Sequence, residues 1–460
     1  MNVYIEVENF GREMEARMLL AMEIASDDNQ IYISDRMQIL NNAACNLISK
    51  GIIFLKDLNS SSEIYSLLKK ARGNGFTIIA TDEEAGIQFD DYESFIKIRS
   101  IKNLDNIDVL IAWGLRDKKI IKRSFTATKT KILSLGSPRI DLCHENFLRM
   151  KKFFCLKKII DDKYILISSN ISFPISIRPM INSIFNRVKE DAVNKDFREK
   201  YLYYKYGNHT LLCYHFIDLI RKIAIHFKDL TFVIRPHPNE TEETWVKLLI
   251  EKFQNIKIIK TGSISDYIFN SELLIHSGCT SGIESYLMKK PSISYLPINL
   301  SNSIDRGISD DLSIVCKEPQ QVIDIINNLK KKKVNNSRNN EIKFRIANPK
   351  YSKSYKKINK IFKIINSAKK YQTENDDNIF LKKNLLFNDA KKKLKIFIKK
   401  KLNINENTVP FLQKFPNLNS SNIRDMFNDL IHTNEKFNTN QWKILNTSTL
   451  KIFKKSNILK

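Results

Sequence analysis

Apolar runs of four or five residues alternate with stretches of helical periodicity through the first three-quarters of the chain. This alternation is typical of parallel βα units. In the first 150 residues we expect strands at Val3–Val7, Ile31–Ile33, Ile52–Leu55, Phe76–Ala80, Val109–Ala112 and Ile132–Leu135. The helical stretches between them predict a mostly parallel sheet with helices on both faces.

The same alternation resumes after residues 151–163, which we interpret as a link between two domains. Further strands are expected at Tyr164–Ser168, Thr231–Ile234 and Glu272–Ile275. The predicted fold class is therefore α/β, with two doubly wound Rossmann-like domains at residues 1–155 and 156–345.

The composition changes beyond residue 345, where Lys becomes dense, Gly is missing and no strand–helix alternation is visible. We expect residues 346–460 to form a Lys-rich helical extension. Within it, Tyr351–Ile365 has the pattern of an amphipathic helix, and Ala390–Lys401 combines apolar residues with a basic face. A basic amphipathic helix fits an anionic membrane surface or an acidic partner. The alternative is a solvated helix that packs on the body of the protein.

The chain is strongly basic, with 76 Lys and Arg against 50 Asp and Glu and a net charge of +26. Such a balance indicates a polyanionic partner, such as a nucleic acid, an anionic membrane or a phosphate-bearing substrate. An A/T-rich genome is the alternative explanation, because it also yields a chain rich in Lys, Asn and Ile. In that case the positive charge has no functional meaning. The six cysteines have no metal-ligand spacing and are interpreted as reduced thiols of a cytosolic protein. No apolar run approaches a membrane span, so we expect any membrane association to be peripheral.

Two motifs follow predicted strands of the second domain. Strand Thr231–Ile234 ends in R-P-H-P, and the two prolines hold His237 in an extended backbone that presents its side chain. The alternative is a rigid turn with a solvent-facing histidine. Strand Glu272–Ile275 runs into H-S-G-C-T-S-G, with Glu284 in the first turn of the next helix.

Small residues at a strand-to-helix turn leave backbone N–H groups and hydroxyls free, which suits a phosphate. The alternative is ordinary helix capping by Thr280 or Ser281. Because the two motifs lie on βα units of one sheet, we expect them to converge on one crevice.

The first domain contributes acidic residues. Asp82, Glu83 and Glu84 come directly after strand Phe76–Ala80, where a carboxylate can act as a general base. The alternative is an exposed acidic loop that caps the next helix. No D-x-D pair ends a strand of the second domain, so no metal site is expected, and positive groups would balance the charge of a bound phosphate instead.

These motifs together resemble glycosyltransferases of the GT-B fold, and more closely the bacterial family of surface carbohydrate biosynthesis proteins. The resemblance covers about three-quarters of the chain and leaves out the basic tail. It is carried by Y-I-E-V-E and R-E-M-E-A-R near the start, T-D-E-E-A-G at 81–86, L-G-S-P-R-I-D at 135–141, V-I-R-P-H-P at 233–238 and S-G-C-T-S-G-I-E-S-Y-L at 277–287. A more distant likeness is to the sialyltransferases and Kdo transferases that use CMP-activated sugars.

The resemblance implies a role for each motif. Glu83 or Glu84 would be the catalytic carboxylate, and His237 would contact the donor phosphate; Asp82, in the same acidic run, is a further candidate for the catalytic carboxylate. Ala85 separates the acidic pair from Gly86, so the choice between the two glutamates stays open. The nucleotide sugar would be bound by residues at the strand ends and the domain edge: Arg235, Pro238, His276, Ser277, Gly278, Thr280, Ser281, Gly282, Glu284, Ser169, Asn170 and Arg139.

The function implied is transfer of a sugar from a nucleotide sugar, with CMP favoured and UDP as the other choice, to a polysaccharide or glycolipid acceptor of the cell surface. No permanently bound cofactor and no nucleic-acid partner are expected, and the place of action would be the inner face of the cytoplasmic membrane. A UDP-sugar 2-epimerase or a polyol-phosphate transferase of similar fold is an alternative. So is a non-catalytic basic protein that binds membrane or nucleic acid.

Overall fold

A computed structural model gives the fold of the chain. It describes residues 1–26, 29–58, 62–83, 104–153, 160, 163–169, 195–237, 240, 242–246, 249, 253–298, 308–329, 339–347, 353–382, 418–446 and 449–454.

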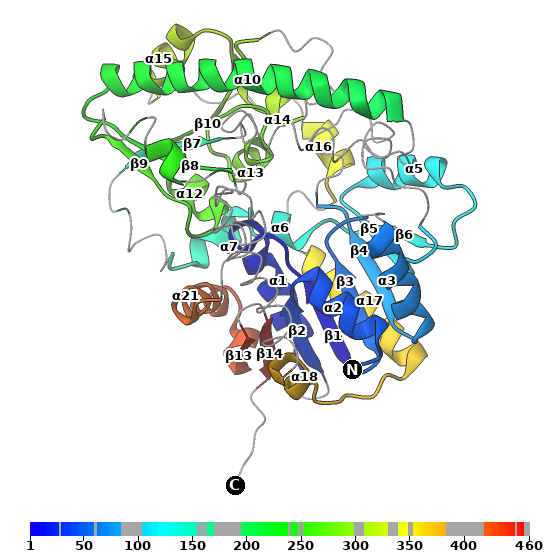
Figure 1. Ribbon diagram of the computed structural model, residues 1–460. Helices are drawn as coiled ribbons and strands as arrows, with labels where there is room; N and C mark the ends of the chain where they lie inside the picture. Colours follow the sequence, from blue (N-terminus) through cyan, green and yellow to red (C-terminus); the bar gives the residue numbers. More distant parts are fainter. Residues whose placement is uncertain are drawn as a thin grey trace, which may run out of the picture.

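The described residues form two lobes, each built around one sheet (Figure 1). The first sheet has eight strands in the order β13-β14-β2-β1-β3-β4-β5-β6. Their bounds are Asn2–Glu6 (β1), Gln30–Ser34 (β2), Gly51–Leu55 (β3), Thr77–Thr81 (β4), Val109–Ala112 (β5), Lys131–Ser134 (β6), Asn440–Asn446 (β13) and Thr449–Lys454 (β14). Strands β1 to β6 pair in parallel, as the apolar runs predicted.

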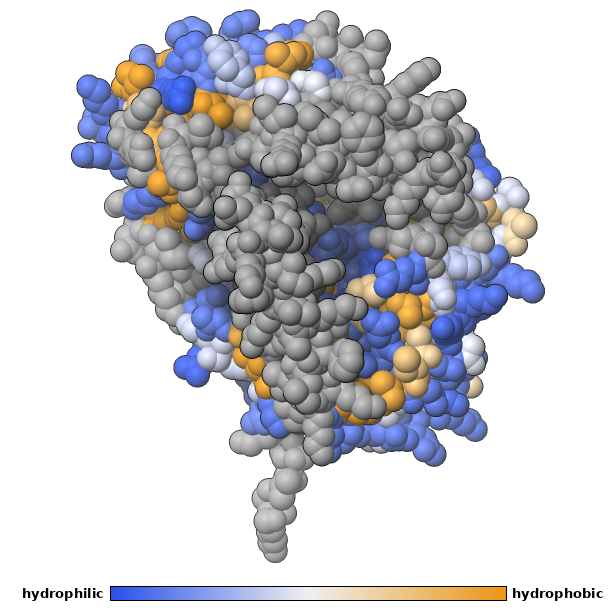
Figure 2. Space-filling model, in the orientation of Figure 1, coloured by the Kyte–Doolittle hydropathy of each residue, from blue (hydrophilic) through white to orange (hydrophobic). Residues whose placement is uncertain are grey.

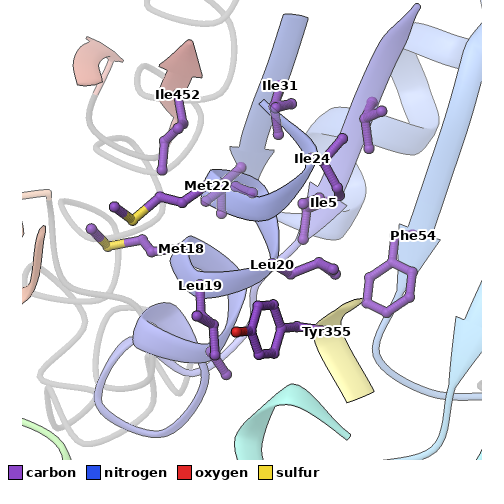
Figure 3. Close-up of a cluster of buried hydrophobic side chains, with 14 of the residues drawn as sticks. Ile5, Met18, Leu19, Leu20, Met22, Ile24, Ile31, Phe54, Tyr355 and Ile452 are labelled. Atoms are coloured by element: carbon purple, nitrogen blue, oxygen red, sulfur yellow. The ribbon is translucent and has the colours of Figure 1, made fainter. Parts of the chain in front are cut away.

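Side chains of these strands alternate between two apolar cores, one on each face of the sheet. Val3 and Ile5 enter the core that contains helix α1 (Phe10–Ile24), which Figure 3 shows, whereas Tyr4 enters the opposite one. The second core is covered by α2 (Arg36–Ala44), α3 (Ser62–Gly73) and α5 (Leu115–Ser124). Burial on both faces explains why the strands are continuous apolar runs.

The end of the chain corrects our expectation of a purely helical tail. Strand β14 pairs antiparallel with β2, and β13 pairs antiparallel with β14, so both extend the first sheet. Helices α17 (Ser354–Lys369) and α21 (Ser420–Ile431) pack into the same core as α1. We missed the strands because the high Lys and Asn content of the tail outweighed, in our interpretation, the short apolar alternation of Trp442 with Ile444 and of Leu450 with Ile452. The basic stretch at residues 390–401 lies outside the described residues.

The second lobe has a six-stranded parallel sheet in the order β12-β11-β10-β7-β8-β9. The strands are Tyr164–Ser168 (β7), Thr231–Arg235 (β8), Ile256–Ile258 (β9), Leu273–His276 (β10), Ser292–Tyr295 (β11) and Ile314–Cys316 (β12). Its helices are α10 (Lys195–His226), α11 (Glu242–Trp245), α12 (Ile264–Asn270), α13 (Ser281–Leu287), α14 (Ile308–Asp311) and α15 (Pro319–Asn327). Figure 1 shows the long α10 across the outer side of this lobe. The prediction of two α/β units is confirmed.

The chain passes between the lobes more than once. Short helices α6 (Pro138–Asp141) and α7 (Glu145–Met150) lead from the first sheet to the second. Helix α16 (Asn339–Arg345) leads back, and Ile342 and Ile346 share a small core with Trp113 of the first lobe and Ile283 of the second. The first lobe is therefore assembled from both ends of the sequence, with α18 (Asp377–Lys382) and a 3-10 turn at Glu435–Thr439 completing it.

Hydrophilic residues cover most of the described surface in the view of Figure 2, with hydrophobic ones in patches. In the described part of the chain, none of the helices has both the length and the apolar character that crossing a membrane requires.

Candidate functional site

The carboxyl end of the first sheet carries a group of charged residues at the place where the strand order changes direction. Strand β2 lies on one side of β1, and β3 lies on the other. Ligands of open α/β sheets bind outside the strand ends at such a point. Here Glu6 ends β1 and Lys56 follows β3, and Glu6 Oε2 accepts a hydrogen bond from the Lys56 backbone N–H at 2.9 Å.

The second sheet has the equivalent point beside β7, with β8 on one side and β10 on the other. Ser168 Oγ, at the end of β7, lies 3.7 Å from Cys279 Sγ in the turn after β10. The segments that carry the predicted phosphate motif and Ser169 are therefore neighbours, as expected from their placement on one sheet.

Glu83 is buried at the first of these points, with only 2% of its surface exposed, as is Asp82. Ser137 Oγ lies 2.9 Å from Glu83 Oε2, Thr81 Oγ1 lies 3.3 Å from Oε1, and Arg17 Nη2 lies 3.5 Å from Oε1. The alternative of an exposed acidic loop is wrong for Asp82 and Glu83. Glu84 lies outside the described residues.

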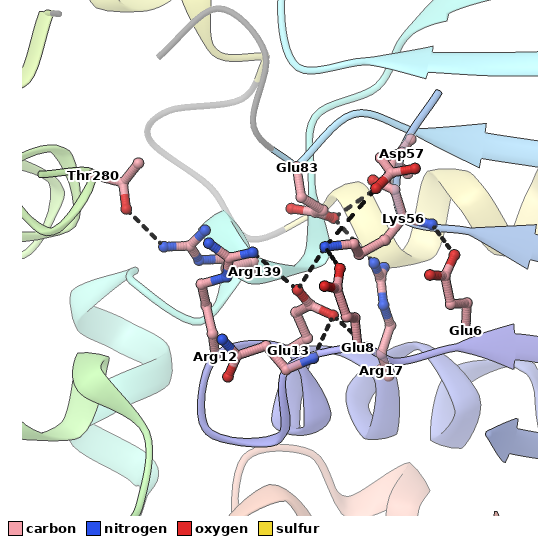
Figure 4. A network of polar contacts seen from close by, with 12 residues as sticks. Glu6, Glu8, Arg12, Glu13, Arg17, Lys56, Asp57, Glu83, Arg139 and Thr280 are labelled. Carbon is pink, nitrogen blue, oxygen red and sulfur yellow. Dashed lines mark hydrogen bonds and ion pairs between the residues drawn. The ribbon is translucent and has the colours of Figure 1, made fainter. Parts of the chain in front are cut away.

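Cations surround the acidic residues of this edge (Figure 4). Lys56 is 3% exposed and contacts Glu8, while its Nζ lies 3.7 Å from Glu13 Oε1. Arg12 Nη2 donates to Glu13 Oε1 at 3.1 Å. Burial acts to raise the pKa of Glu13, but Lys56, Arg12 and Arg17 together hold it below its usual value. Glu13 is therefore ionised, and its negative charge attracts Lys56, Arg12 and Arg17 to the same edge of the sheet.

Arg139 joins this edge to the second lobe. Its Nη2 donates to Thr280 Oγ1 at 3.1 Å and to Glu284 Oε1 at 2.5 Å, and all three side chains belong to our predicted site. Figure 4 shows Arg139 between Thr280 and the charged residues of α1. The carboxyl ends of the two sheets thus meet, as the crevice predicted from the motifs requires.

Lys151 makes a second connection between the lobes. Its ammonium group is buried between Glu15 of α1 and Asp266 of α12, both of which it contacts. Burial raises the pKa of Glu15 to about 7, although Lys151 opposes this, and Asp266 adds to the rise. The predicted linker at residues 151–163 therefore begins as a buried, ion-paired segment.

The turn after β10 is organised by His276, which is fully buried. Its Nδ1 lies 3.4 Å from the Cys279 backbone N–H, and its Nε2 lies 2.8 Å from Ser313 Oγ. Burial lowers the pKa of His276 to about 3, so the ring is neutral. A Cβ at residue 282 would lie 2.5 Å from His276 Nε2, which explains the glycine there. Both ring nitrogens of His276 are engaged within the protein, where they hold this turn, and its contact with the donor stays a prediction.

Three polar groups near this turn are buried and have no hydrogen-bond partner. Within the described residues, nothing accepts from or donates to Ser277 Oγ, Ser281 Oγ or Arg139 Nη1. Thr280 occupies the capping position of α13, yet its side chain makes no capping bond. The alternative of ordinary side-chain capping by Thr280 or Ser281 is therefore wrong. Buried polar groups normally find a partner, so these three are suited to a ligand. Gly278 lies in the same turn with a φ of 62°.

Arg235 does not present its charge to a ligand, which corrects our expectation. Its guanidinium donates to the backbone carbonyls of Ile259 and Gly262 at 3.0 and 2.8 Å, and also contacts that of Thr261. Its Cζ lies 4.5 Å from the ring centre of Tyr267. Arg235 therefore fixes the loop after β9.

The backbone of His237 is held by a residue that our sequence analysis did not select. The buried Glu240 Oε2 accepts from the His237 N–H at 3.0 Å and from Trp245 Nε1 at 2.8 Å, and it also contacts Ser169 Oγ. Ser169 Oγ in turn accepts from the His237 N–H at 3.0 Å. His237 is half-buried, while Pro238 and Asn170 lie outside the described residues.

Sequence reasoning also missed Lys56 and Arg17. Lys56 directly follows an apolar strand. Asp82 and Glu83 were selected by the same signal, so the sequence could have indicated this lysine as well. Arg17 lies within a helix, where a charged residue is usually assigned to a solvated face. Among the described residues, no group of three or more His, Cys, Asp or Glu side chains is arranged to hold a metal ion.

The sequence matches no protein-family model and no curated protein. Solved structures of similar fold include the UDP-GlcNAc 2-epimerase of Methanocaldococcus jannaschii in complex with UDP-GlcNAc and UDP. It is 13% identical, with a TM-score of 0.48 over 79% of this chain and 99% of that one. The UDP-GlcNAc 2-epimerase of Neisseria meningitidis is 14% identical, with a TM-score of 0.48 over 79% and 100%. A variant of the wall teichoic acid polymerase TagF is 12% identical, with a TM-score of 0.49 over 81% and 90%. These likenesses concern the fold alone.

Proposed function

We propose that the protein is an enzyme that binds a nucleotide sugar between its lobes and transfers the sugar to an acceptor of a surface polysaccharide or glycolipid. The observation that carries this proposal is the group of buried, unpartnered donors at Ser277, Ser281 and Arg139 Nη1, where the strand ends of the two lobes meet. Phosphate oxygens are acceptors that satisfy hydroxyl and guanidinium donors at once.

In this proposal the second lobe holds the phosphate of the donor. Ser277 and Ser281 donate to its oxygens, and Arg139 adds positive charge from the first lobe. His237, held by Glu240 and Ser169, follows β8, which β7 separates from β10, and it stabilises the charge that develops on the leaving phosphate.

The first lobe supplies the base. Glu83 is fixed by the hydroxyls of Ser137 and Thr81, so its carboxylate has a defined direction. It takes the proton of the acceptor hydroxyl as the bond to the sugar forms. Glu84 remains the other candidate from the resemblance to the CMP-sugar transferases, and Asp82 is a candidate from its place in the same acidic run.

Nucleotide binding tests the proposal directly. We expect CMP or UDP to raise the melting temperature of the full-length protein, and the double variant Ser277→Ala/Ser281→Ala to bind that nucleotide roughly tenfold more weakly, because two hydrogen bonds to an ionised group are lost. Ser285→Ala is the matched control: it lies in the same helix and donates to the Lys290 carbonyl at 3.1 Å, so it should lower stability without changing nucleotide affinity. Failure of CMP, UDP, GDP and CDP alike to bind would contradict the proposal.

Product analysis then defines the reaction. Transfer releases the nucleotide only when an acceptor is present, and His237→Ala should abolish that release while the protein stays folded. Conversion of the sugar without an acceptor would show an epimerase instead. Binding to anionic vesicles or RNA, with no nucleotide bound by the body of the protein, would show the non-catalytic alternative.

A further inference from the structure

Arg17 is a buried cation whose hydrogen-bond donors are not used. It lies in the second turn of α1, and its side chain is 1% exposed. Within the described part of the chain, none of its guanidinium nitrogens Nε, Nη1 and Nη2 has a hydrogen-bond partner. A buried guanidinium without hydrogen bonds is unfavourable, since it has lost its water without replacement.

The neighbours of Arg17 do not account for these donors. Glu83 lies 3.5 Å away, beyond a normal hydrogen bond to Nη2, and it already receives the hydroxyls of Ser137 and Thr81. The Phe54 ring centre lies 5.2 Å from Arg17 Cζ, which favours a cation but accepts no N–H in the guanidinium plane. Within the described residues, the donors of the guanidinium are therefore available to a different partner.

Other cations lie at the same sheet edge. Lys56 Nζ and Arg12 Nη2 are 3.7 and 3.1 Å from Glu13 Oε1. Lys56 also contacts Glu8, which is 34% exposed and is the least buried acid of the group. Figure 4 shows Arg12 and Arg17 extending from α1 towards the same group of acidic residues that Lys56 contacts.

We propose that Arg17, with Lys56 beside it, forms an oxyanion-binding subsite on the first lobe, separate from the phosphate donors of the second lobe. The fork of Arg17 matches the oxygens of a phosphate or a carboxylate. The assignment of this anion to the acceptor rests on the proposed function, in which the second lobe holds the nucleotide. The acceptor class is then a glycan or glycolipid that carries a phosphate or carboxylate near its reacting hydroxyl.

The test is a titration of the full-length protein with inorganic phosphate, and separately with acetate, followed by thermal unfolding and calorimetry. Wild type should be stabilised in a saturable way by at least one of the two anions, and their comparison tells phosphate from carboxylate recognition. Arg17→Gln should bind that anion at least tenfold more weakly, because a charge-assisted pair is lost. Arg17→Lys keeps the charge without the fork and should show an intermediate affinity. If Arg17→Gln does not fold, a lower anion affinity of Arg17→Lys than of wild type is the test of the subsite.

Arg36→Gln is the matched control. Arg36 lies at the same edge, but its Nε and Nη2 donate to Glu6 at 2.8 and 3.0 Å and to Asp57 at 2.6 Å, so its donors are used within the protein. It should lose stability without anions and keep the anion response, whereas Arg17→Gln should lose the response.

No stabilisation of wild type by either anion would overturn the subsite, as would an equal response in wild type and both Arg17 variants. The proposed function is judged apart from this result, because it depends on nucleotide binding. If the anion response depends on Arg17 but no nucleotide binds, the result supports the subsite and contradicts the proposed transfer function.

Discussion

Arg139 Nη2 lies 2.5 Å from Glu284 Oε1, and this pair joins the two lobes at the ends of their sheets. Both residues are buried, with Arg139 6% and Glu284 2% exposed. The pair thus links a residue that follows β6 to the first turn of α13. It holds the lobes together and places the free Nη1 of Arg139 beside the turn of Ser277.

We expect Arg139→Met to lower the free energy of unfolding by about 3 kcal/mol, because the buried Glu284 carboxylate loses its cationic partner. The double variant Arg139→Met/Glu284→Gln should recover part of this loss, since the uncompensated charge is then gone. Denaturant unfolding of the two single variants and the double variant measures the coupling. Additive losses would mean that the pair does not act as a unit.

Glu240 should be essential for the shape of the His237 segment. Glu240→Ala removes the acceptor of Trp245 Nε1 and one of the two acceptors of the His237 N–H, the other being Ser169 Oγ. We expect a loss of about 2 kcal/mol, mainly because the buried Trp245 Nε1 loses its partner. Under the proposed function it should also slow nucleotide release, as His237 loses its position. Glu242→Ala, two residues further and exposed, is the control and should change stability by less than about 0.5 kcal/mol. Equal effects of the two changes would remove the special role of Glu240.

The same glycine-to-alanine change should have opposite effects at two helical positions. In Gly282→Ala the new Cβ meets His276 Nε2 at 2.5 Å, so the buried ring or the helix must move, at a cost of about 1–3 kcal/mol. In Gly207→Ala of α10 nothing lies within 4 Å of the new Cβ, and the better helix propensity should add about 0.5–1 kcal/mol. Melting temperatures of the two variants against wild type provide the measurement, and destabilisation by Gly207→Ala would contradict the account.

His276 should make stability fall in mild acid. Its pKa is lowered to about 3 in the folded protein by burial, against about 6.5 when unfolded. Below pH 6.5 the unfolded chain binds a proton that the folded one does not, so stability is lost as the pH falls from 6.5 towards 3. Between pH 7.5 and pH 5 this amounts to about 2 kcal/mol. Denaturant unfolding at the two pH values should show this difference in wild type and less of it in His276→Gln; the same difference in both proteins would exclude His276 as its source.

The order of strands and helices could be predicted from the sequence because buried parallel strands leave continuous apolar runs. The runs at residues 164–168 and 231–234 are strands as expected. Strands β13 and β14 could not be predicted in this way, since β13 pairs with β14, and β14 pairs with β2, a segment more than 400 residues distant in the chain.

The candidate site was predicted in part for the same reason. Polar residues after a strand mark its carboxyl end, which selected Glu83, Ser277 and Ser281 without a structure. Position along a strand does not reveal burial or partners, however. His276 and Arg235 match the pattern as well as His237 does, yet the structure uses them to hold loops.

The sequence by itself determined the two α/β units, their order and the strand ends at which polar residues gather, because these follow from local periodicity and turn chemistry. Only the tertiary structure decided that the basic tail completes the first sheet, that Arg139 and Lys151 join the lobes, and that Arg17 is buried with donors that no described residue accepts. These features depend on contacts between segments far apart in the chain, and the free energy of a buried charge is set by whatever the fold brings next to it.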